Sequence, residues 1–230
     1  MQMWLYRMSI LLLAIGRAFS AEAQSPVLQA NAVVGKSMTL VYDININTDK
    51  TSAGIEETYN GGTKTVLLKD YKLRIRLVSL MRINSMYFLK TGTALYKVLI
   101  TKESGQRKYK YSLTPSEWKF YNAKYDSIAY SFTEDSLSIL GYNCKKVILS
   151  LKNGTEEVTA YYSPQLSPLD KYAEPMFAGI PGLVLRYEHT ENQGTISFTA
   201  SKLSFDEIDE LIFAEPTKGY KQKKYEPTSR

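Results

Sequence analysis

Two residue types that often serve nucleophilic or general-base chemistry, cysteine and histidine, are rare in this 230-residue sequence. The chain has one cysteine, Cys144, and one histidine, His189. Cys144 precedes Lys145 and Lys146, whose positive charges favour a reactive thiolate if they lie close. Neighbouring strand residues point to opposite faces, however, and cysteine is among the residue types most often buried. We therefore predict that Cys144 packs in the core, and a hydrolase that uses this thiol remains the alternative.

His189 follows an apolar strand, in the run Glu188–His189–Thr190. A single histidine provides no cluster for zinc and no second candidate base for a serine triad. We interpret it as an exposed loop residue without a catalytic role. Paired carboxylates are another route to hydrolysis, but 23 acidic residues leave too many pairs to choose from. The sequence thus favours a non-catalytic protein, assigns no catalytic residue and predicts no cofactor.

A cluster of acids near the C-terminus is the candidate cation site. It consists of Asp206, Glu207, Asp209 and Glu210. Their spacing differs from the Asp-x-Asp-x-Asp-Gly pattern of calcium loops, so we predict no metal. Ser204 is a suitable N-cap with Glu207 three residues later, which predicts a short helix over residues 204–213 with a solvated acidic face.

The chain is organised around residues 174–188, EPMFAGIPGLVLRYE. Pro181 has the φ that the second position of a tight turn needs, and Gly182 can adopt the positive φ that a type II turn requires next. An apolar strand follows at once, over residues 183–187. We predict that this turn determines the fold and does not bind a ligand.

Alternating strands must position these groups. Residues 38–46, 70–80 and 194–203 alternate apolar with polar side chains, and the second of them places Lys72, Arg74 and Arg76 on one face. Such a cationic stripe is typical of a sheet face exposed to solvent, and the functional alternative is that the stripe binds an anion. Residues 115–126 are predicted to be strand or irregular. The 18 tyrosines also favour β-structure. The predicted fold is mainly β: a single antiparallel, curved sheet or open half-barrel with one or two short helices.

The apolar faces of these strands must be covered. One helix over residues 204–213 covers only part of such an area, which leaves room for an apolar cavity. We hypothesise that the cavity accepts an acyl chain or another apolar group. The alternative is a cavity filled by the protein's own tyrosine, phenylalanine and methionine side chains.

The two ends of the chain differ from the middle. Residues 1–23 have the features of a cleaved secretory signal: Arg7, an apolar run of about nine residues, and a small-x-small site before Gln24. The run is too short to span a bilayer, which takes about 20 residues. We expect a single β-rich domain over residues 24–217 and a basic, flexible, frayed tail over residues 218–230. The mature protein is then periplasmic or secreted, without a transmembrane span.

Charge restricts the partners. Removal of residues 1–23 lowers the formal net charge from +6 to +5. This mild excess suits anionic partners such as lipid headgroups or surface polysaccharide, and an exported location argues against nucleic acid.

Three motifs resemble the GLPGLI family of exported bacterial envelope proteins. The first, over residues 139–147, contains Gly141, Tyr142 and Cys144, and the second is the aromatic pair Tyr161–Tyr162. The third is GIPGLV, which contains Gly179, Pro181, Gly182 and Leu183. The resemblance implies an exported envelope protein and transfers no catalytic residue, so we interpret these motif positions as structural.

The strand pattern also resembles the open half-barrels of periplasmic lipoprotein and lipid carriers. Together these observations predict an exported, non-catalytic envelope binding module of unknown ligand that holds an apolar or lipid group. A protein–protein interaction partner within an envelope complex is the alternative. The oligomeric state is left open.

Overall fold

The computed structural model describes residues 37–47, 59–89, 97–151, 154, 156–191 and 194–226. The expected signal peptide lies outside the described residues. The described chain contains one α-helix, α2 (Pro115–Tyr121), and three 3₁₀ turns, η1 (Ala123–Tyr125), η3 (Pro175–Phe177) and η4 (Glu210–Phe213). Its strands are β1 (Ser37–Asn47), β2 (Thr63–Lys69), β3 (Lys72–Val78), β4 (Arg82–Leu89), β5 (Lys97–Ser104), β6 (Arg107–Leu113), β7 (Ala129–Ile139), β8 (Tyr142–Leu151), β9 (Glu156–Ser163), β10 (Leu183–Glu191), β11 (Gly194–Ser204) and β12 (Lys221–Gln222).

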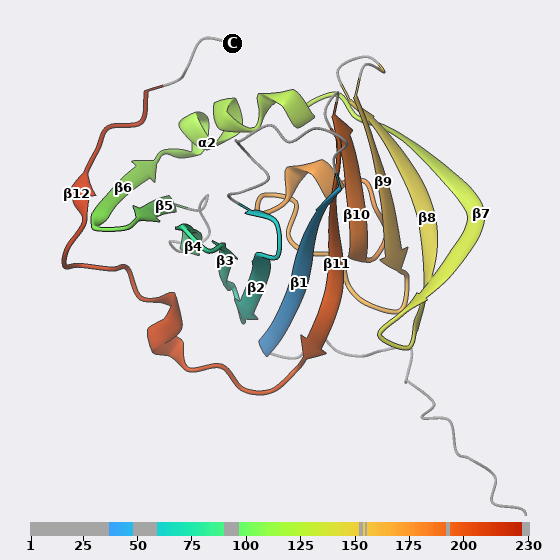
Figure 1. Ribbon diagram of the computed structural model, residues 1–230, viewed down its shortest axis with the longest axis horizontal. Coiled ribbons are helices and arrows are strands. Elements are labelled where there is room, and N and C mark those ends of the chain that lie inside the picture. The colour runs from blue at the N-terminus through green and yellow to red at the C-terminus, as the bar shows by residue number, and fades with distance from the viewer. Residues whose placement is uncertain are drawn as a thin grey trace, which may run out of the picture.

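All of these strands belong to one curved sheet, in the order β12-β6-β5-β4-β3-β2-β1-β11-β10-β9-β8-β7. Neighbouring strands are antiparallel except β12, which runs parallel to β6. Figure 1 shows the sheet curving from β12 round to β7 without closing into a barrel. The prediction of a mainly β fold with one open, curved sheet is therefore confirmed.

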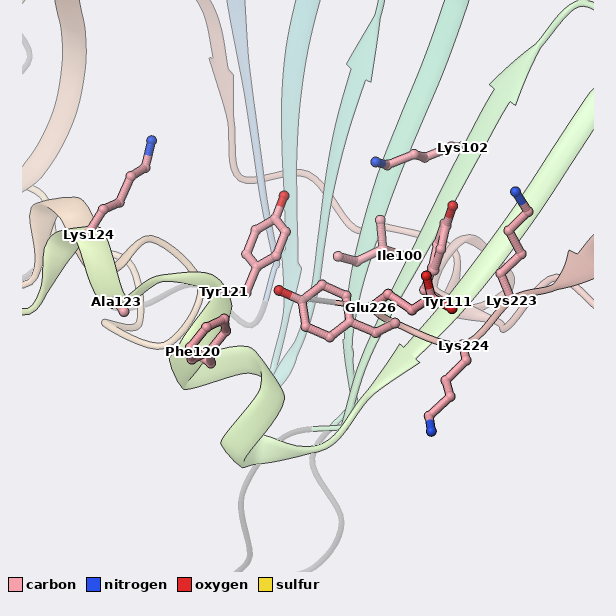
Figure 2. Close-up of a pocket in the computed structure, with 11 residues that line it drawn as sticks. Ile100, Lys102, Tyr111, Phe120, Tyr121, Ala123, Lys124, Lys223, Lys224 and Glu226 are labelled. Atoms are coloured by element: carbon pink, nitrogen blue, oxygen red, sulfur yellow. The ribbon is translucent and has the colours of Figure 1, made fainter. Parts of the chain in front are cut away.

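The C-terminal residues 218–226 lie against β6, whereas a frayed tail was expected. Lys221 and Gln222 pair with β6, and the amide of Lys223 donates to the carbonyl of Lys110 over 2.9 Å. The Tyr220 hydroxyl donates to the Glu103 carboxylate over 2.5 Å. In Figure 2 the following residues continue past the end of β6 towards α2. The segment docks because β6 is an edge strand, whose free backbone groups it satisfies.

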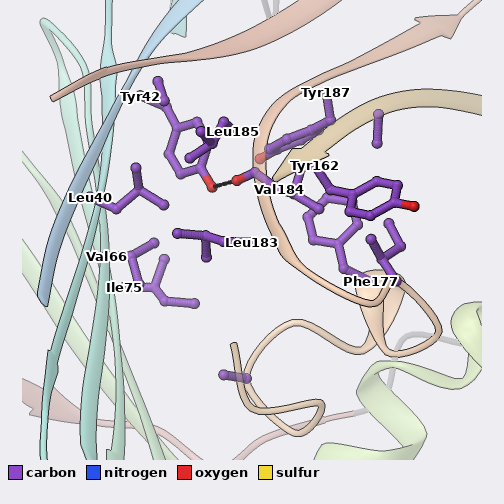
Figure 3. Close-up of a cluster of buried hydrophobic side chains, with 14 of the residues drawn as sticks. Leu40, Tyr42, Val66, Ile75, Tyr162, Phe177, Leu183, Val184, Leu185 and Tyr187 are labelled. Atoms are coloured by element: carbon purple, nitrogen blue, oxygen red, sulfur yellow. Dashed lines mark hydrogen bonds between the residues drawn. The ribbon is translucent and has the colours of Figure 1, made fainter. Parts of the chain in front are cut away.

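The inner face of the sheet, on the inside of its curve, is apolar and holds the core. Leu40 and Tyr42 of β1 and Val66 of β2 are fully buried there. Figure 3 shows them pointing towards the beginning of β10, where the Tyr42 hydroxyl donates to the carbonyl of Val184 over 2.7 Å. The alternation seen in the sequence thus places every second side chain inside the curve.

Two segments cover the inner face, and neither is the predicted helix. The first comprises α2 and η1. Thr114 caps α2 in a capping box with Glu117, with Pro115 in the first turn, so a helix forms where strand or irregular structure was expected. Trp118 packs edge-to-face on Phe88 of β4, 5.3 Å between centroids. The second segment is the loop of residues 164–182, which contains η3. We call these two segments the cover.

The predicted helix over residues 204–213 is wrong. Ser204 ends β11, and only the short turn η4 forms. Residues 205–217 cross the outer face of the sheet as a strap, with Ile208 and Phe213 buried beneath it.

Ion pairs accompany the burial of Ile208 and Phe213 along this path. Along the strap, acids pair with lysines on strands progressively further from β1: Glu207 with Lys69 of β2, Glu210 with Lys72 of β3, and Glu215 with Lys110 of β6. From β2 to β6 is about 19 Å, whereas eight residues of α-helix span about 12 Å. Glu210 of the acidic cluster thus pairs with Lys72 of the cationic stripe, and Arg74 of the stripe donates to the carbonyl of Ile212 in the strap. The sequence predicted neither contact.

Candidate ligand groove

Two adjoining cavities lie between the inner face and the cover, with volumes of about 320 and 380 Å³. We call them together the inner groove. Both are lined by the same six residues, which makes the groove continuous; these are Leu77, Lys124, Tyr125, Met176, Tyr187 and Phe198. Its walls are mostly apolar, because the floor is made of inward-pointing strand residues such as Ile75, Met86 and Ile196.

A buried ion pair crosses the groove from floor to cover. Lys64 of β2 contacts the carboxylate of Glu174, the residue that precedes η3. Their side chains are only 8% and 11% exposed. The Lys64 ammonium also donates to the Tyr187 hydroxyl over 3.1 Å and lies 5.0 Å from the ring centroids of both Tyr42 and Tyr187. Aromatic faces attract a cation, so they help to compensate its burial. The pair fastens the cover to the sheet.

The two tyrosines beside this pair stay protonated. Burial raises the pKa of Tyr187 well above 10.0, and the nearby Glu174 carboxylate raises it further. Burial also raises the pKa of Tyr42, although the positive charge of Lys64 opposes the shift. Both hydroxyls therefore act as neutral hydrogen-bonding groups across the accessible pH range.

The sequence offered one signal of this ion pair. Lys64 occupies an inward position on β2, in register with the buried Val66, and a cation on an apolar face needs a partner. Its partner Glu174 is 110 positions away, so the sequence did not reveal which acid it meets.

His189 lines the groove, in contrast to the expected exposed loop position. It lies within β10, is half-buried and pairs across the sheet with Val158 and Ile196. The strand continues beyond the apolar run because its next residues still find ladder partners on both sides. Sequence reasoning placed the end of this strand too early.

The GIPGLV motif forms the end of the cover, beside the groove. Pro181 is exposed, whereas Gly182 and Leu183 are buried. Gly182 does not have the positive φ that the type II assignment required, so that assignment is wrong. A Cβ at Gly182 would lie 2.3 Å from the carbonyl oxygen of Ser163. Glycine is needed here because the chain passes against the backbone at the end of β9 as it enters β10.

Gly179 makes a second close approach. A Cβ there would lie 2.6 Å from the ring of Tyr130 on β7. The hydroxyl of this tyrosine donates to the carbonyl of Met176 over 3.1 Å and accepts from the Gly179 amide over 3.3 Å. Tyr130 thus holds the loop of the cover against β7, the strand at one edge of the sheet.

The other motif residues lie away from the groove. Leu140 and Gly141 have φ of +52° and +82° and form the two-residue turn between β7 and β8, which is the geometry of a type I′ hairpin. Tyr142 begins β8. Cys144 is buried, and burial raises the pKa of its thiol to about 11. A thiol of that pKa is protonated near neutrality and is a poor nucleophile.

Within the described residues, no group of three or more histidine, cysteine or acidic side chains is arranged to hold a metal ion. In that same part of the chain, no helix combines the length and apolar character needed to cross a bilayer.

No protein-family model and no curated protein sequence matches the chain. Crystal structures of PNGF-II in space groups C2 and P21 each align over 82% of this chain, with 14% identity and a TM-score of 0.44. The alignment covers 31% of the PNGF-II chain, so this protein spans about a third of its length. LprF from Mycobacterium bovis aligns over 76% of this chain and 90% of its own, with 11% identity and a TM-score of 0.31. Likenesses this distant carry no argument about the groove, and the resemblance to the GLPGLI family remains a prediction.

Proposed function

We propose that this protein is an exported, non-catalytic envelope module that binds an apolar chain, such as an acyl chain, in the inner groove. The observation that carries the proposal is the groove itself. It is an apolar hollow on the inner face, beneath the cover, that side chains of the protein leave open. Its two cavities, of about 320 and 380 Å³, each fall in the range of small-molecule sites.

The composition of the walls supports a chain-like apolar ligand. Leucine, isoleucine, methionine and aromatic side chains supply most of the lining, and burial of an acyl chain against them is favourable by about 0.8 kcal/mol for each methylene. Three polar groups of the lining satisfy one another, since Lys64 contacts both Glu174 and Tyr187. They therefore favour an apolar segment over a polar ligand such as a sugar.

The cover is the part of the protein through which we propose that a ligand reaches the inner groove. The cover is formed by α2, short turns and a loop, and it is held to the sheet by the Lys64–Glu174 pair, by Tyr130 and by buried side chains such as Phe177. Segments of this kind open locally at lower cost than the strands of a sheet. We propose that the ligand enters by local displacement of the loop of residues 164–182.

Native mass spectrometry of the protein purified without detergent, together with titration of a fluorescent fatty acid, tests the proposal. Leu77 lines both cavities, so Leu77→Trp should fill the groove and weaken binding at least tenfold. Val78 neighbours it on β3 and points to the opposite face, so Val78→Trp is the matched control and should change affinity less than twofold.

A protein that carries no lipid and does not bind the fatty acid would overturn the proposal. The protein–protein alternative would then become the better interpretation of the curved sheet. Equal weakening by both tryptophan variants would show that binding occurs elsewhere than in the groove.

A further inference from the structure

A third and larger cavity, of about 770 Å³, continues the inner groove towards β6 (Figure 2). It shares Tyr121 and Lys124 with the groove. Three parts of the chain enclose it: the inner face of β5 and β6, the segment of α2 and η1, and the C-terminal residues 223–226. Unlike the groove, this cavity is rich in cations.

Four lysines line the cavity against a single acid, Glu226. They are Lys102, Lys124, Lys223 and Lys224. Figure 2 shows that they come from three parts of the chain: Lys102 from β5, Lys124 from η1, and Lys223 and Lys224 from the C-terminal segment. Like charges gathered in this way repel one another, and an anion bound among them relieves the repulsion.

These lysines differ from those of the outer face in how they are paired. Lys69, Lys72 and Lys110 each form a salt bridge with an acid of the strap. Among the residues that the structure describes, no salt bridge is formed by any of the four lysines of the cavity. Glu117 acts on Lys224 only through its longer-range charge.

Aromatic rings lie close to two of these ammonium groups. Lys102 lies 5.6 Å from the ring centroid of Tyr111, and Lys223 lies 4.0 Å from that of Tyr109. A cation over an aromatic face retains donors on its open side, and those donors can bind a carboxylate or a phosphate oxygen. Lys102 is also notable for its place, because it follows the buried Val98 and Ile100 on the inner face of β5.

We propose that this cavity binds the anionic head group, a carboxylate or phosphate, of the same amphiphile whose chain lies in the inner groove. This inference rests on the proposed function, since it requires a chain in the adjoining groove. Continuity through Tyr121 and Lys124 places the charged and apolar sites side by side. The C-terminal segment is then part of the site, and its pairing with β6 positions Lys223.

Competition against a fluorescent fatty acid at low salt tests the inference with three probes: palmitate, its uncharged methyl ester, and inorganic phosphate. Wild-type protein should bind palmitate at least tenfold more tightly than the ester. The Lys102→Gln/Lys223→Gln variant should lose about tenfold in affinity for palmitate and leave affinity for the ester unchanged. The Lys218→Gln/Lys221→Gln variant removes the same charge from residues outside the cavity lining and should change both affinities less than twofold.

Each outcome separates this inference from the proposed function. If palmitate and its ester bind equally well, the groove binds chains but the lysines recognise no head group, and only this inference fails. If neither binds, the proposed function fails. Binding of inorganic phosphate without palmitate would also overturn the head-group assignment, because the cavity would then take a free anion. Salt dependence that persists unchanged in the Lys102→Gln/Lys223→Gln variant would place the anion elsewhere.

Discussion

Replacement of Gly182 by alanine tests the close approach at the end of the cover. The added Cβ would lie 2.3 Å from the oxygen and 2.8 Å from the carbon of the Ser163 carbonyl, whereas ordinary contacts begin at 3.4 Å. Relief requires a displacement of about 1 Å between two segments of backbone. Neither segment is free to move, since Ser163 is fully buried, pairs with Leu183, and accepts a hydrogen bond from the Leu166 amide.

The expected cost lies at the upper end of the range for overpacking, about 3 kcal/mol. For a chain of this size each kcal/mol lowers the melting temperature by about 2–4 °C, so Gly182→Ala should melt roughly 6–12 °C below wild type. Thermal unfolding followed by circular dichroism and urea unfolding followed by fluorescence both measure this loss. The urea midpoint should fall without a change in the slope.

Two further variants isolate the cause. Gly61 has φ of +69°, and no atom lies within 4 Å of the position that a Cβ would occupy there. Gly61→Ala therefore reports left-handed backbone strain alone, which should cost about 1 kcal/mol of stability. Asparagine tolerates positive φ, so Gly182→Asn would lower stability only slightly if a type II turn were present. It should lower stability strongly if the close approach of the backbone is the constraint. A Gly182→Ala melting temperature within about 2 °C of wild type, or a harmless Gly182→Asn, would refute the reasoning.

Three other perturbations follow from the geometry. Burial raises the pKa of Cys144 from 9.0 to about 11, so iodoacetamide at pH 8 should label the native thiol roughly 100-fold more slowly than the unfolded one. Labelling should accelerate as the pH rises towards 11, and rapid labelling near neutrality would contradict the burial of this thiol. Lys64→Met should lower the free energy of unfolding in urea by about 3–5 kcal/mol, because Glu174 is left buried without its cation. The double variant Lys64→Met/Glu174→Leu should recover most of that stability, and an equal loss of stability in both variants would contradict the ion pair. Deletion of residues 220–230 should lower the melting temperature by several degrees because it removes β12 and the hydrogen bond to Glu103, whereas an unchanged melting curve would restore the frayed-tail prediction.

The strands were predictable because their signal is local. Residues 38–46 and 194–203 alternate in period 2, and the structure contains β1 and β11 at those places. The helix α2 was missed although its signal was also local, since Thr114 and Glu117 form a capping box around a proline at the first turn. The aromatic residues that follow obscured this pattern, because tyrosine and phenylalanine also favour strands.

The path of the strap, the role of Gly182 and the groove could not be predicted from the sequence, because each depends on contacts between distant segments. Ser204 and Glu207 have the spacing of a capping box, yet the strap extends across the outer face, where Ile208 and Phe213 are buried and the acids pair with Lys69 and Lys72. Gly182 belongs to a Pro–Gly pair that is typical of a type II turn, and only the position of Ser163 shows the true constraint. The groove is likewise a product of assembly, since its walls come from both halves of the sheet.

The central position of β1 has a consequence for the order of folding. The strands β2 to β6 and β7 to β11 are each paired with their neighbours in sequence, so both groups can form from local contacts. Within the sheet only the pairing of β1 with β11 joins them, and it brings together residues as far apart in the sequence as Thr39 and Ser204. A nascent chain therefore keeps the apolar sides of two separate half-sheets exposed until β11 has emerged. This interval, when almost the whole chain is present but the sheet is still divided, is the period in which a chaperone would be needed most.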